Sequence, residues 1–239
     1  AVALDPGLAE AHNDRGVILA TSGLIPDALA CFERAVALAP GYAEARNNLA
    51  RGLRSLGRFD EAVAQFELIL KSTPGSALAH FNLASVLEPA GQQSAAEKHY
   101  RSAIARRLAR DGAAVLLHAS SRPEAVEQLA ETIRAAGGTA ECHVFDLRSD
   151  EATAVGCVAM LQGGPVQILV NNAGVHDDAV LPGMRPEQWH KVIDVSLNGF
   201  FHVTQPLLLP MLRTRWGRIL NISSVASLTG NKGQVNYAA

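Results

Sequence analysis

The chain has 239 residues, of which 48% are hydrophobic and 18% charged, and its formal net charge is −2. This length allows two modest hydrophobic cores, and the near-neutral charge argues against nucleic acid and anionic membranes as partners. No apolar run approaches the ~20 residues of a membrane span. The three cysteines are far apart and form neither a disulfide framework nor a zinc motif, so we expect a reducing, cytoplasmic location. Because Ala1 lies inside a repeat unit, a targeting segment further upstream stays an open alternative.

A 34-residue period dominates the first half of the chain. Proline, glycine, alanine and aromatic residues each recur at this step. The columns are Pro6, Pro40 and Pro74; Gly23, Gly57 and Gly91; Ala28, Ala62 and Ala96; Phe32, Phe66 and Tyr100; Gly16, Ala50 and Ala84; and Leu19, Leu53 and Leu87. We expect the small residues to let paired helices approach closely, and the Gly23 column to end the first helix of each pair at positive φ.

This period resembles the tetratricopeptide repeat over about residues 6–105. The resemblance implies an α-helical repeat solenoid of three repeats, in a domain of residues 1–105. A last helix is expected from about Ser94 to Ala109. Such arrays usually bind an extended peptide, and carboxylate-binding versions line their groove with Lys, Arg and Asn. Asn13, Asn47 and His80 or Asn82 are candidates for a partial lining; the alternative is that they are solvated polar positions.

From about residue 103, short apolar strands alternate with helices. The expected strands are Ala113–His118, a segment that includes His143–Phe145, Val166–Val170 and Arg218–Ile222. The expected helices are Pro123–Ala136, Asp150–Leu161 and Pro186–Met211, the last in at least two pieces. This alternation predicts a parallel sheet with helices on both faces.

Polar residues follow three of these strands at their carboxyl ends. Asp146 follows the second strand, Asn171–Gly174 follow the third and Ser223-Ser224 follow the fourth. Ligands of open parallel sheets bind beyond the carboxyl ends of the strands, where the strand order switches. We therefore expect the site at this edge of the sheet.

The segments Asn171-Asn172-Ala173-Gly174 and Ser223-Ser224 … Asn236-Tyr237-Ala238-Ala239 together resemble the middle of a short-chain dehydrogenase/reductase. The resemblance covers residues 103–239, and Trp216–Ile219 and Gly230–Gln234 look most like the 3-oxoacyl-[acyl-carrier-protein] reductases of fatty acid biosynthesis. It implies an incomplete Rossmann-type parallel sheet with flanking helices, in a domain of residues 106–239. Family members are dimers or tetramers.

The resemblance also implies hydride transfer from a nicotinamide cofactor to an acyl-carrier-protein thioester or another carbonyl substrate. Tyr237 corresponds to the general acid, and Ser224 to the residue that orients the carbonyl and stabilises its developing charge. Ser196 aligns with the Asn of the family's proton relay, and Asn198 lies two residues later. The family's Lys, four residues after the Tyr, would be residue 241, beyond the printed sequence.

On the cofactor side, the resemblance places Asn172, Ala173 and Gly174 against the ribose and Asp146 and Leu147 at the adenine. Ser120, Ser121 and Arg122 end the first strand, where the 2′ position of the cofactor belongs. No carboxylate stands there to bond a 2′-hydroxyl, and Arg122 suits a 2′-phosphate, so NADP is favoured over NAD. The same segment, Ser-Ser-Arg-Pro, also suits a helix N-cap with a first-turn proline.

The family's glycine-rich phosphate loop does not precede Ser102, where the repeat array stands instead. Its strand would be the central one, between the first and third strands seen here. Three hypotheses follow. In the first, the chain is an NADP-dependent 3-oxoacyl-carrier reductase fragment with little or no activity. In the second, it is a peptide-binding scaffold that carries a degenerate reductase remnant. In the third, two unrelated genes are joined near Ser102–Ala105.

Overall fold

The computed structural model describes residues 7–121, 123–224, 230 and 232–238. The chain forms two compact units. The first comprises Ala1–Val115 with Thr132–Thr139, and the second Leu116–Glu131 with Ala140–Ala239. The domain boundary expected at residue 105 stays a prediction.

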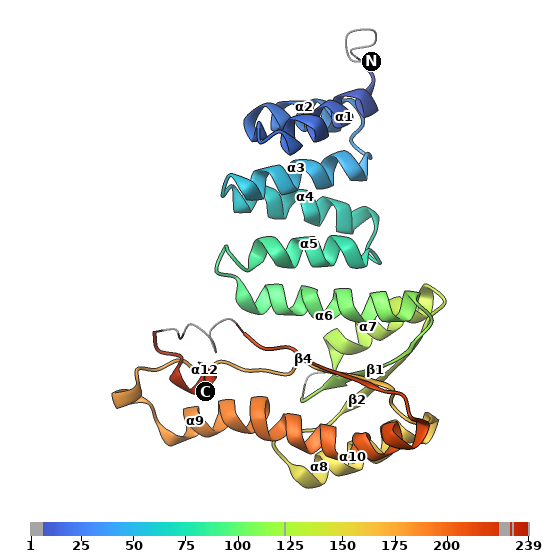
Figure 1. The fold of residues 1–239 in the computed structure, drawn as a ribbon, viewed down its shortest axis with the longest axis vertical. Coiled ribbons are helices and arrows are strands. Elements are labelled where there is room, and N and C mark those ends of the chain that lie inside the picture. The colour runs from blue at the N-terminus through green and yellow to red at the C-terminus, as the bar shows by residue number, and fades with distance from the viewer. Residues whose placement is uncertain (1–6, 122, 225–229, 231, 239) are drawn as a thin grey trace. The chain divides into compact units, whose positions relative to one another are not determined.

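Six helices build the repeats of the first unit, and Figure 1 shows them stacked as successive pairs. They are α1 (Ala9–Thr21), α2 (Ile25–Leu38), α3 (Ala43–Ser55), α4 (Phe59–Ser72), α5 (Ala77–Leu87) and α6 (Gln93–Arg110). Pro40 and Pro74 stand just beyond the ends of α2 and α4, as the sequence predicts. The last helix extends one residue beyond its expected range at each end.

The glycines of the repeat turns have the predicted left-handed conformation. Gly23, Gly57 and Gly91 have φ of 80°, 72° and 76°. At the first of these turns, the Leu24 amide donates to the Leu19 carbonyl at 3.0 Å, which satisfies a carbonyl at the end of α1. The expectation for this column is therefore confirmed.

Close packing of the two helices within a repeat depends on the Gly16 column. A Cβ atom added at Gly16 would lie 2.5 Å from the ring of Phe32, well inside van der Waals contact. Ala50 and Ala84, the equivalents of Gly16, are fully buried, and so is Phe66, the equivalent of Phe32. One continuous apolar core links the repeats, and it includes the Ala28 column.

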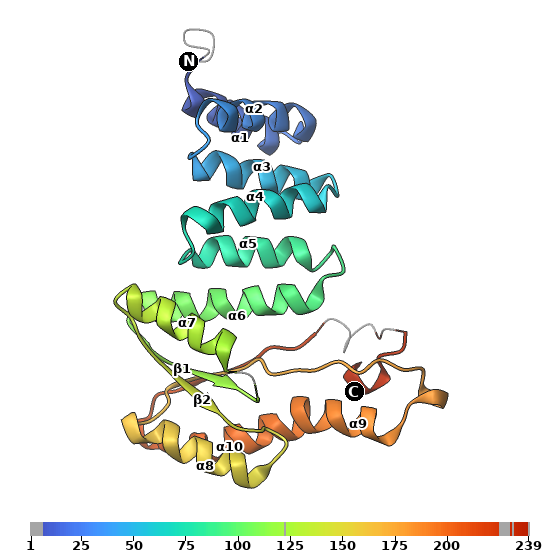
Figure 2. The same cartoon turned by 180° about the vertical axis from the view of Figure 1, so that it is seen from behind.

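The described part of the second unit contains four strands and the helices that connect them. In chain order the elements are β1 (Ala114–Ala119), α7 (Glu124–Ala135), β2 (Thr139–Val144), α8 (Asp150–Met160), β3 (Ile168–Asn171), α9 (Pro186–Ile193), α10 (Gly199–Thr214), β4 (Arg218–Asn221) and α12 (Val235–Ala238). Some of these elements cross the unit boundary. Figures 1 and 2 show α7 on one side of β1 and β2, with α8 and α10 on the other.

These strands form two separate pairs. β1 pairs with β2, and β3 pairs in parallel with β4, with Ile168 opposite Arg218 and Asn171 opposite Asn221. The parallel sheet predicted from the sequence is therefore present in an incomplete form. Among the described residues, no hydrogen-bonded ladder joins β1 to β3, which is where the sequence predicts a missing strand.

A small core holds the helices against the first pair of strands. Phe145 and Leu147, just after β2, are buried with Met160 of α8. Val203 of α10 packs on the same cluster. Gly156 of α8 lies directly under Phe145, because a Cβ atom added there would lie 2.3 Å from the ring.

Gly16→Val should lower the free energy of unfolding of the repeat unit by roughly 1–3 kcal/mol, because the added side chain overlaps the Phe32 ring. Gly41→Val is the matched control, since a Cβ atom at Gly41 meets no atom within 4 Å. Urea unfolding followed by helical circular dichroism measures both. Equal unfolding midpoints for the two variants would contradict the close contact.

Candidate functional site

The segment after β3 is attached to the helix that carries Tyr237. The Ala179 amide donates to the Gly233 carbonyl at 2.8 Å. The side-chain amide of Asn236, which is buried, donates to the Asp177 carbonyl at 3.0 Å and to the Gln188 carbonyl at 3.1 Å. These bonds join α12 to the chain beyond the Asn-Asn-Ala-Gly motif and to α9, so they fix the backbone beside Tyr237.

The ring of Tyr237 packs against the imidazole of His176. Their centroids lie 4.0 Å apart, with an angle of 47° between the ring planes. His176 follows Gly174 by two residues, so this contact brings the predicted general acid close to the predicted ribose-binding segment. Neither the contact nor a role for His176 was predicted from the sequence, since nothing in its local pattern indicates so distant a partner.

Asp177 fixes the same segment to α9. Its carboxylate accepts from the Gln188 side chain at 2.7 Å and from Lys191 at 2.8 Å. The hydrogen bond from Lys191, followed by that from Gln188, holds the pKa of Asp177 below its usual value. The sequence explains why α9 begins here. Pro186 occupies the first turn of α9, and the backbone amide of Arg185 donates to the side-chain oxygen of Gln188 at 3.1 Å.

Ser196 lies in a π-helical segment, Asp194–Asn198, between α9 and α10. Its hydroxyl oxygen is buried and has no hydrogen-bond partner among the described residues. Asn198, in contrast, is exposed and donates to Asp194 at 2.8 Å. Single π-turns inside helices are frequent at functional sites. Of these two side chains, only Ser196 therefore has a buried polar atom without a hydrogen-bond partner among the described residues.

Ser224 lies beyond the end of β4. The strand pairing continues to the residue before Ser223, because the Ile222 amide donates to the Asn171 carbonyl at 2.9 Å. Asn171 also donates to Asn221 at 3.0 Å and to Thr204 at 3.2 Å, which holds the start of the Asn-Asn-Ala-Gly motif against β4 and α10. Ser224 and Asn172 thus follow the carboxyl ends of neighbouring parallel strands.

The predicted adenine-binding pair follows β2. Arg148 donates to both carboxylate oxygens of Asp146, and these bonds hold the pKa of Asp146 below its usual value. Leu147 is buried, and its Cβ lies 3.0 Å from where a Cβ at Gly199 would be. Ser120 and Ser121 are exposed directly after β1, and Arg122 lies outside the described residues.

The dinucleotide does not fit these residues as a whole. Pyrophosphate binding in such folds uses the free N–H groups at the start of the helix that follows the first strand. Here the corresponding helix is α6, whose N-terminal part is the second helix of a repeat and packs on α5. A Cβ atom at Gly174 meets no atom within 4 Å, so this glycine does not mark a tight phosphate cradle either.

Polar side chains on the first helices of the repeats mostly bond one another. Asn48 donates to Asn13 at 2.9 Å, and Asn82 donates to Asn47 at 2.7 Å. His80 stacks on His99, and burial, with nearby Arg106, lowers the pKa of His80 to about 4. At neutral pH this histidine therefore offers no positive charge to a carboxylate. These contacts stabilise the packing of successive repeats.

A family model for short chain dehydrogenases matches residues 102–239, which is more than half of the chain. The chain belongs to this family. Three overlapping matches to a tetratricopeptide repeat model cover residues 1–43, 13–77 and 47–113, so the repeats of the first half are confirmed as well. Repeats of this kind indicate protein–protein interaction. The family resemblances read from the sequence are both confirmed.

The similar proteins include 3-oxoacyl-[acyl-carrier-protein] reductases. The 3-oxoacyl-[acyl-carrier-protein] reductase FabG of Pseudomonas aeruginosa is 40% identical over 148 residues, 61% of this chain and 59% of that protein. Nodulation protein G of a Rhizobium species is 42% identical over 138 residues, 57% of this chain and 55% of that protein. The chain thus spans less than two thirds of these relatives.

A solved structure also resembles part of this chain. A gluconate 5-dehydrogenase from Burkholderia cenocepacia, in complex with NADP and tartrate, superposes with a TM-score of 0.53 at 32% identity. The match covers 57% of this chain and 55% of that one. Together with the repeats, this confirms the predicted fold class. Among the described residues, no helix has the length and apolar character needed to cross a membrane.

Asn236→Ala should loosen α12, because the Asp177 and Gln188 carbonyls lose a buried donor. We expect amide hydrogen exchange at Tyr237 and Ala238 to accelerate by on the order of tenfold. Asn198→Ala removes an exposed amide and should leave this exchange unchanged. Equal exchange rates at Tyr237 in the two variants would contradict the proposed attachment.

Proposed function

We propose that residues 102–239 carry the substrate-side half of an NADP-dependent reductase site of the 3-oxoacyl-[acyl-carrier-protein] reductase type. Support comes from the family match, from the reductases that share about 40% identity over part of their length, and from the NADP-bound structural relative. The proposed substrate is a β-keto thioester on an acyl carrier protein, and the bond reduced is its ketone carbonyl.

In this proposal two side chains act on the carbonyl oxygen, and a third supports one of them. The Tyr237 hydroxyl donates a proton to the oxygen as it becomes an alkoxide. The Ser224 hydroxyl donates a hydrogen bond to the same oxygen and stabilises its growing charge. Ser196, whose buried hydroxyl has no partner among the described residues, holds a water molecule that returns a proton toward Tyr237. Asn172, Ala173 and Gly174 line the ribose side of the site.

The observation that carries the proposal is the attachment of Tyr237 to the segment after β3. Asn236, the residue before Tyr237, bonds two carbonyls of other segments, and the Tyr237 ring packs on His176. A general acid must be held within hydrogen-bond reach of its substrate, and this set of contacts provides such a fixed position.

We further propose that these 239 residues bind NADP weakly and have little or no reductase activity, because among the described residues α6 leaves no free helix N-terminus for the pyrophosphate. In this proposal the adenine lies against Asp146 and Leu147. The 2′-phosphate lies near Ser120 and Ser121, with Arg122 as its proposed partner.

The test is NADPH oxidation with an acetoacetyl thioester, measured for the chain and for Tyr237→Phe. We expect a rate that does not differ between the two proteins. Ser102→Ala, outside the proposed site, controls for nonspecific effects of substitution. A clear rate that falls about 100-fold or more in Tyr237→Phe alone would support the reductase chemistry and contradict the proposed low activity.

A second candidate is a peptide-binding scaffold that carries the reductase-like half without using it. The observation in its favour is the exposed apolar surface of α5, where Leu78 is 65% and Phe81 51% exposed. This candidate predicts that peptides from a broad library perturb the α5 amide signals in NMR spectra. A library without such a binder would count against it.

A further inference from the structure

Two histidines connect the helices of the third repeat. His80 on α5 and His99 on α6 approach with their Nδ1 atoms 2.8 Å apart, and their rings stack with centroids 5.1 Å apart. The Nε2 atom of His80 lies 3.2 Å from the carbonyl oxygen of Pro74, in the turn that precedes α5. The pair therefore joins this turn, the first helix and the second helix of the repeat.

The hydrogen bond between the rings limits how many protons the pair can carry. An N–H···N bond needs a lone pair on one of the two Nδ1 atoms. With both imidazoles neutral, His80 donates from Nε2 to the Pro74 carbonyl, so its Nδ1 accepts from Nδ1 of His99. One added proton still leaves such a lone pair. When both imidazoles are charged, however, an N–H group of each ring faces the other, and the contact cannot persist.

The surroundings of the pair oppose positive charge. Burial is the main cause that lowers the pKa of both histidines, and the pKa of His80 falls to about 4. Arg106 and Lys98 of α6 also lower the pKa of His80, and Lys98 lowers that of His99. The hydrogen bond to Pro74 acts on His80 in the opposite direction but is outweighed. Both rings are therefore neutral in the folded repeat at neutral pH.

Few other charged groups lie around the pair. A hollow of about 430 Å³ beside His99 includes Glu67 and Lys71 of α4 in its lining. The carboxylate of Glu67 raises the pKa of His99, but burial and Lys98 have the larger effect. His80 is the only ionisable side chain within α5, and the turn of residues 73–76 has none. A charge on the pair thus has one carboxylate to offset it.

The preceding repeat fills the same positions with side chains that do not titrate. Shifting the histidine pair back by 34 residues gives Arg46 and Gln65. Arg46 donates to the side-chain oxygen of Gln65 at 2.7 Å and to the Pro40 carbonyl at 2.7 Å. Arginine stays charged and glutamine stays neutral at all ordinary pH values. The same connection of turn and helices therefore occurs in a form independent of pH.

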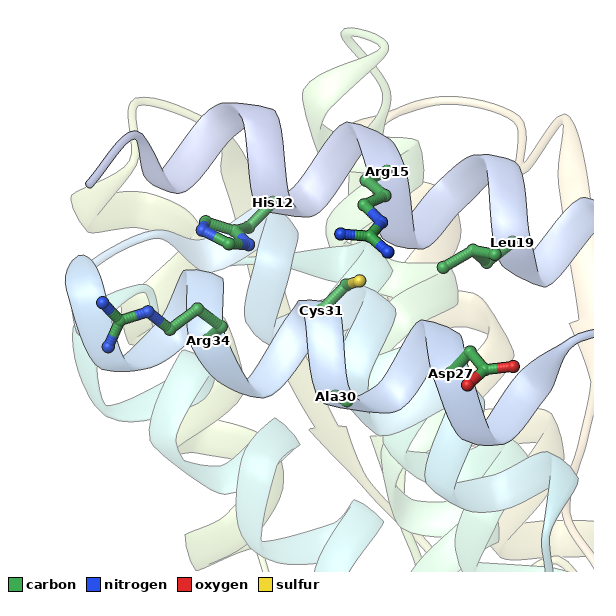
Figure 3. Close-up of a pocket in the computed structure, with 7 residues that line it drawn as sticks. All are labelled: His12, Arg15, Leu19, Asp27, Ala30, Cys31 and Arg34. Atoms are coloured by element: carbon green, nitrogen blue, oxygen red, sulfur yellow. The ribbon is translucent and has the colours of Figure 1, made fainter. Parts of the chain in front are cut away.

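The first repeat has a third combination, His12 and Cys31, at these positions. Figure 3 shows the two residues on neighbouring helices, α1 and α2, among the residues that line a hollow of about 460 Å³. A thiol is only a weak hydrogen-bond donor and acceptor, so this combination does not reproduce the bond between two imidazoles. In the described part of the repeats, two imidazoles face each other at these positions only in the third repeat.

We propose that the histidine pair makes the third repeat acid-sensitive: when both imidazoles are charged, their hydrogen bond breaks and α5 loosens from α6. Leu83 and Leu87 of α5 and Ala96 of α6 belong to the buried core, and they become accessible to water in the loosened state. The second repeat keeps its packing because its Arg46–Gln65 bond does not titrate. This device is separate from the proposed reductase site and does not depend on it.

The direction of the pH dependence follows from the lowered pKa of His80. A histidine in the unfolded chain takes up a proton near pH 6.5, whereas His80 in the folded repeat does so near pH 4. The opened repeat therefore binds more protons throughout this range. The stabilisation is complete above about pH 6.5 and is lost as the pH falls toward about 4. At about pH 5 ordinary carboxylates are still mostly ionised, so the histidines titrate before general acid unfolding begins.

The second repeat supplies the matched variant, because its side chains fill these positions without titrating. His80→Arg combined with His99→Gln places that pair in the third repeat. Amide hydrogen exchange of the full chain, corrected for intrinsic exchange rates, measures local opening at pH 7 and pH 5. In the native chain we expect the protection of α5 and α6 to fall by about tenfold, and in the double variant by less than about twofold. The protection of α3 and α4 should stay unchanged in both proteins.

The reverse exchange guards against a folding defect in the first variant. Arg46→His combined with Gln65→His should make the protection of α3 and α4 acid-dependent, while α5 and α6 respond as in the native chain. The proposal is overturned if α5 and α6 of the native chain keep their protection at pH 5, or if the native chain and the first variant lose it equally. An α3 and α4 protection without acid dependence in the reverse exchange would overturn it as well.

Discussion

A strand inside a parallel sheet forms backbone hydrogen bonds with a neighbour on each side, and this requirement governs the second unit. Two pairs of strands satisfy it in part, β1 with β2 and β3 with β4, and no ladder among the described residues connects the pairs. The strand that would join them is also the one that leads into the phosphate-binding loop in this family. One missing element therefore accounts for both the divided sheet and the lack of a pyrophosphate cradle.

The part of the candidate site around Tyr237 is nevertheless held together by several hydrogen bonds. Asn171 joins the end of β3 to β4 and α10, and Asp177 and Asn236 join the following segment to α9 and α12. These bonds do not pass through the missing strand, so its loss leaves the surroundings of Tyr237 in place. In the proposed function, two tasks are thus separate: positioning Tyr237 as the proposed acid and holding the dinucleotide.

Local signals made much of this fold predictable. The glycines at 34-residue spacing tolerate positive φ, so they mark the turn that ends the first helix of each repeat. The apolar runs predict the positions of the strands to within a few residues. The Asn-Asn-Ala-Gly motif and Tyr237 mark the candidate site in the same way. The His176–Tyr237 contact and the Asp177–Lys191 pair join separate segments of the chain, and no local pattern encodes them. Likewise, the asparagines that suggested a peptide lining bond each other across repeats, because stacking brings successive helices within reach.

The most direct test of this account is a fluorescence titration of NADPH against the chain and against a chimera. The chimera carries the first strand and glycine loop of the Pseudomonas aeruginosa reductase in front of residue 103. We predict that NADPH binds the chimera saturably and the chain itself only weakly, with a dissociation constant at least about tenfold higher, a difference of about 1.4 kcal/mol. Equal, tight binding to both proteins would contradict the claim that the missing strand removes the cofactor site.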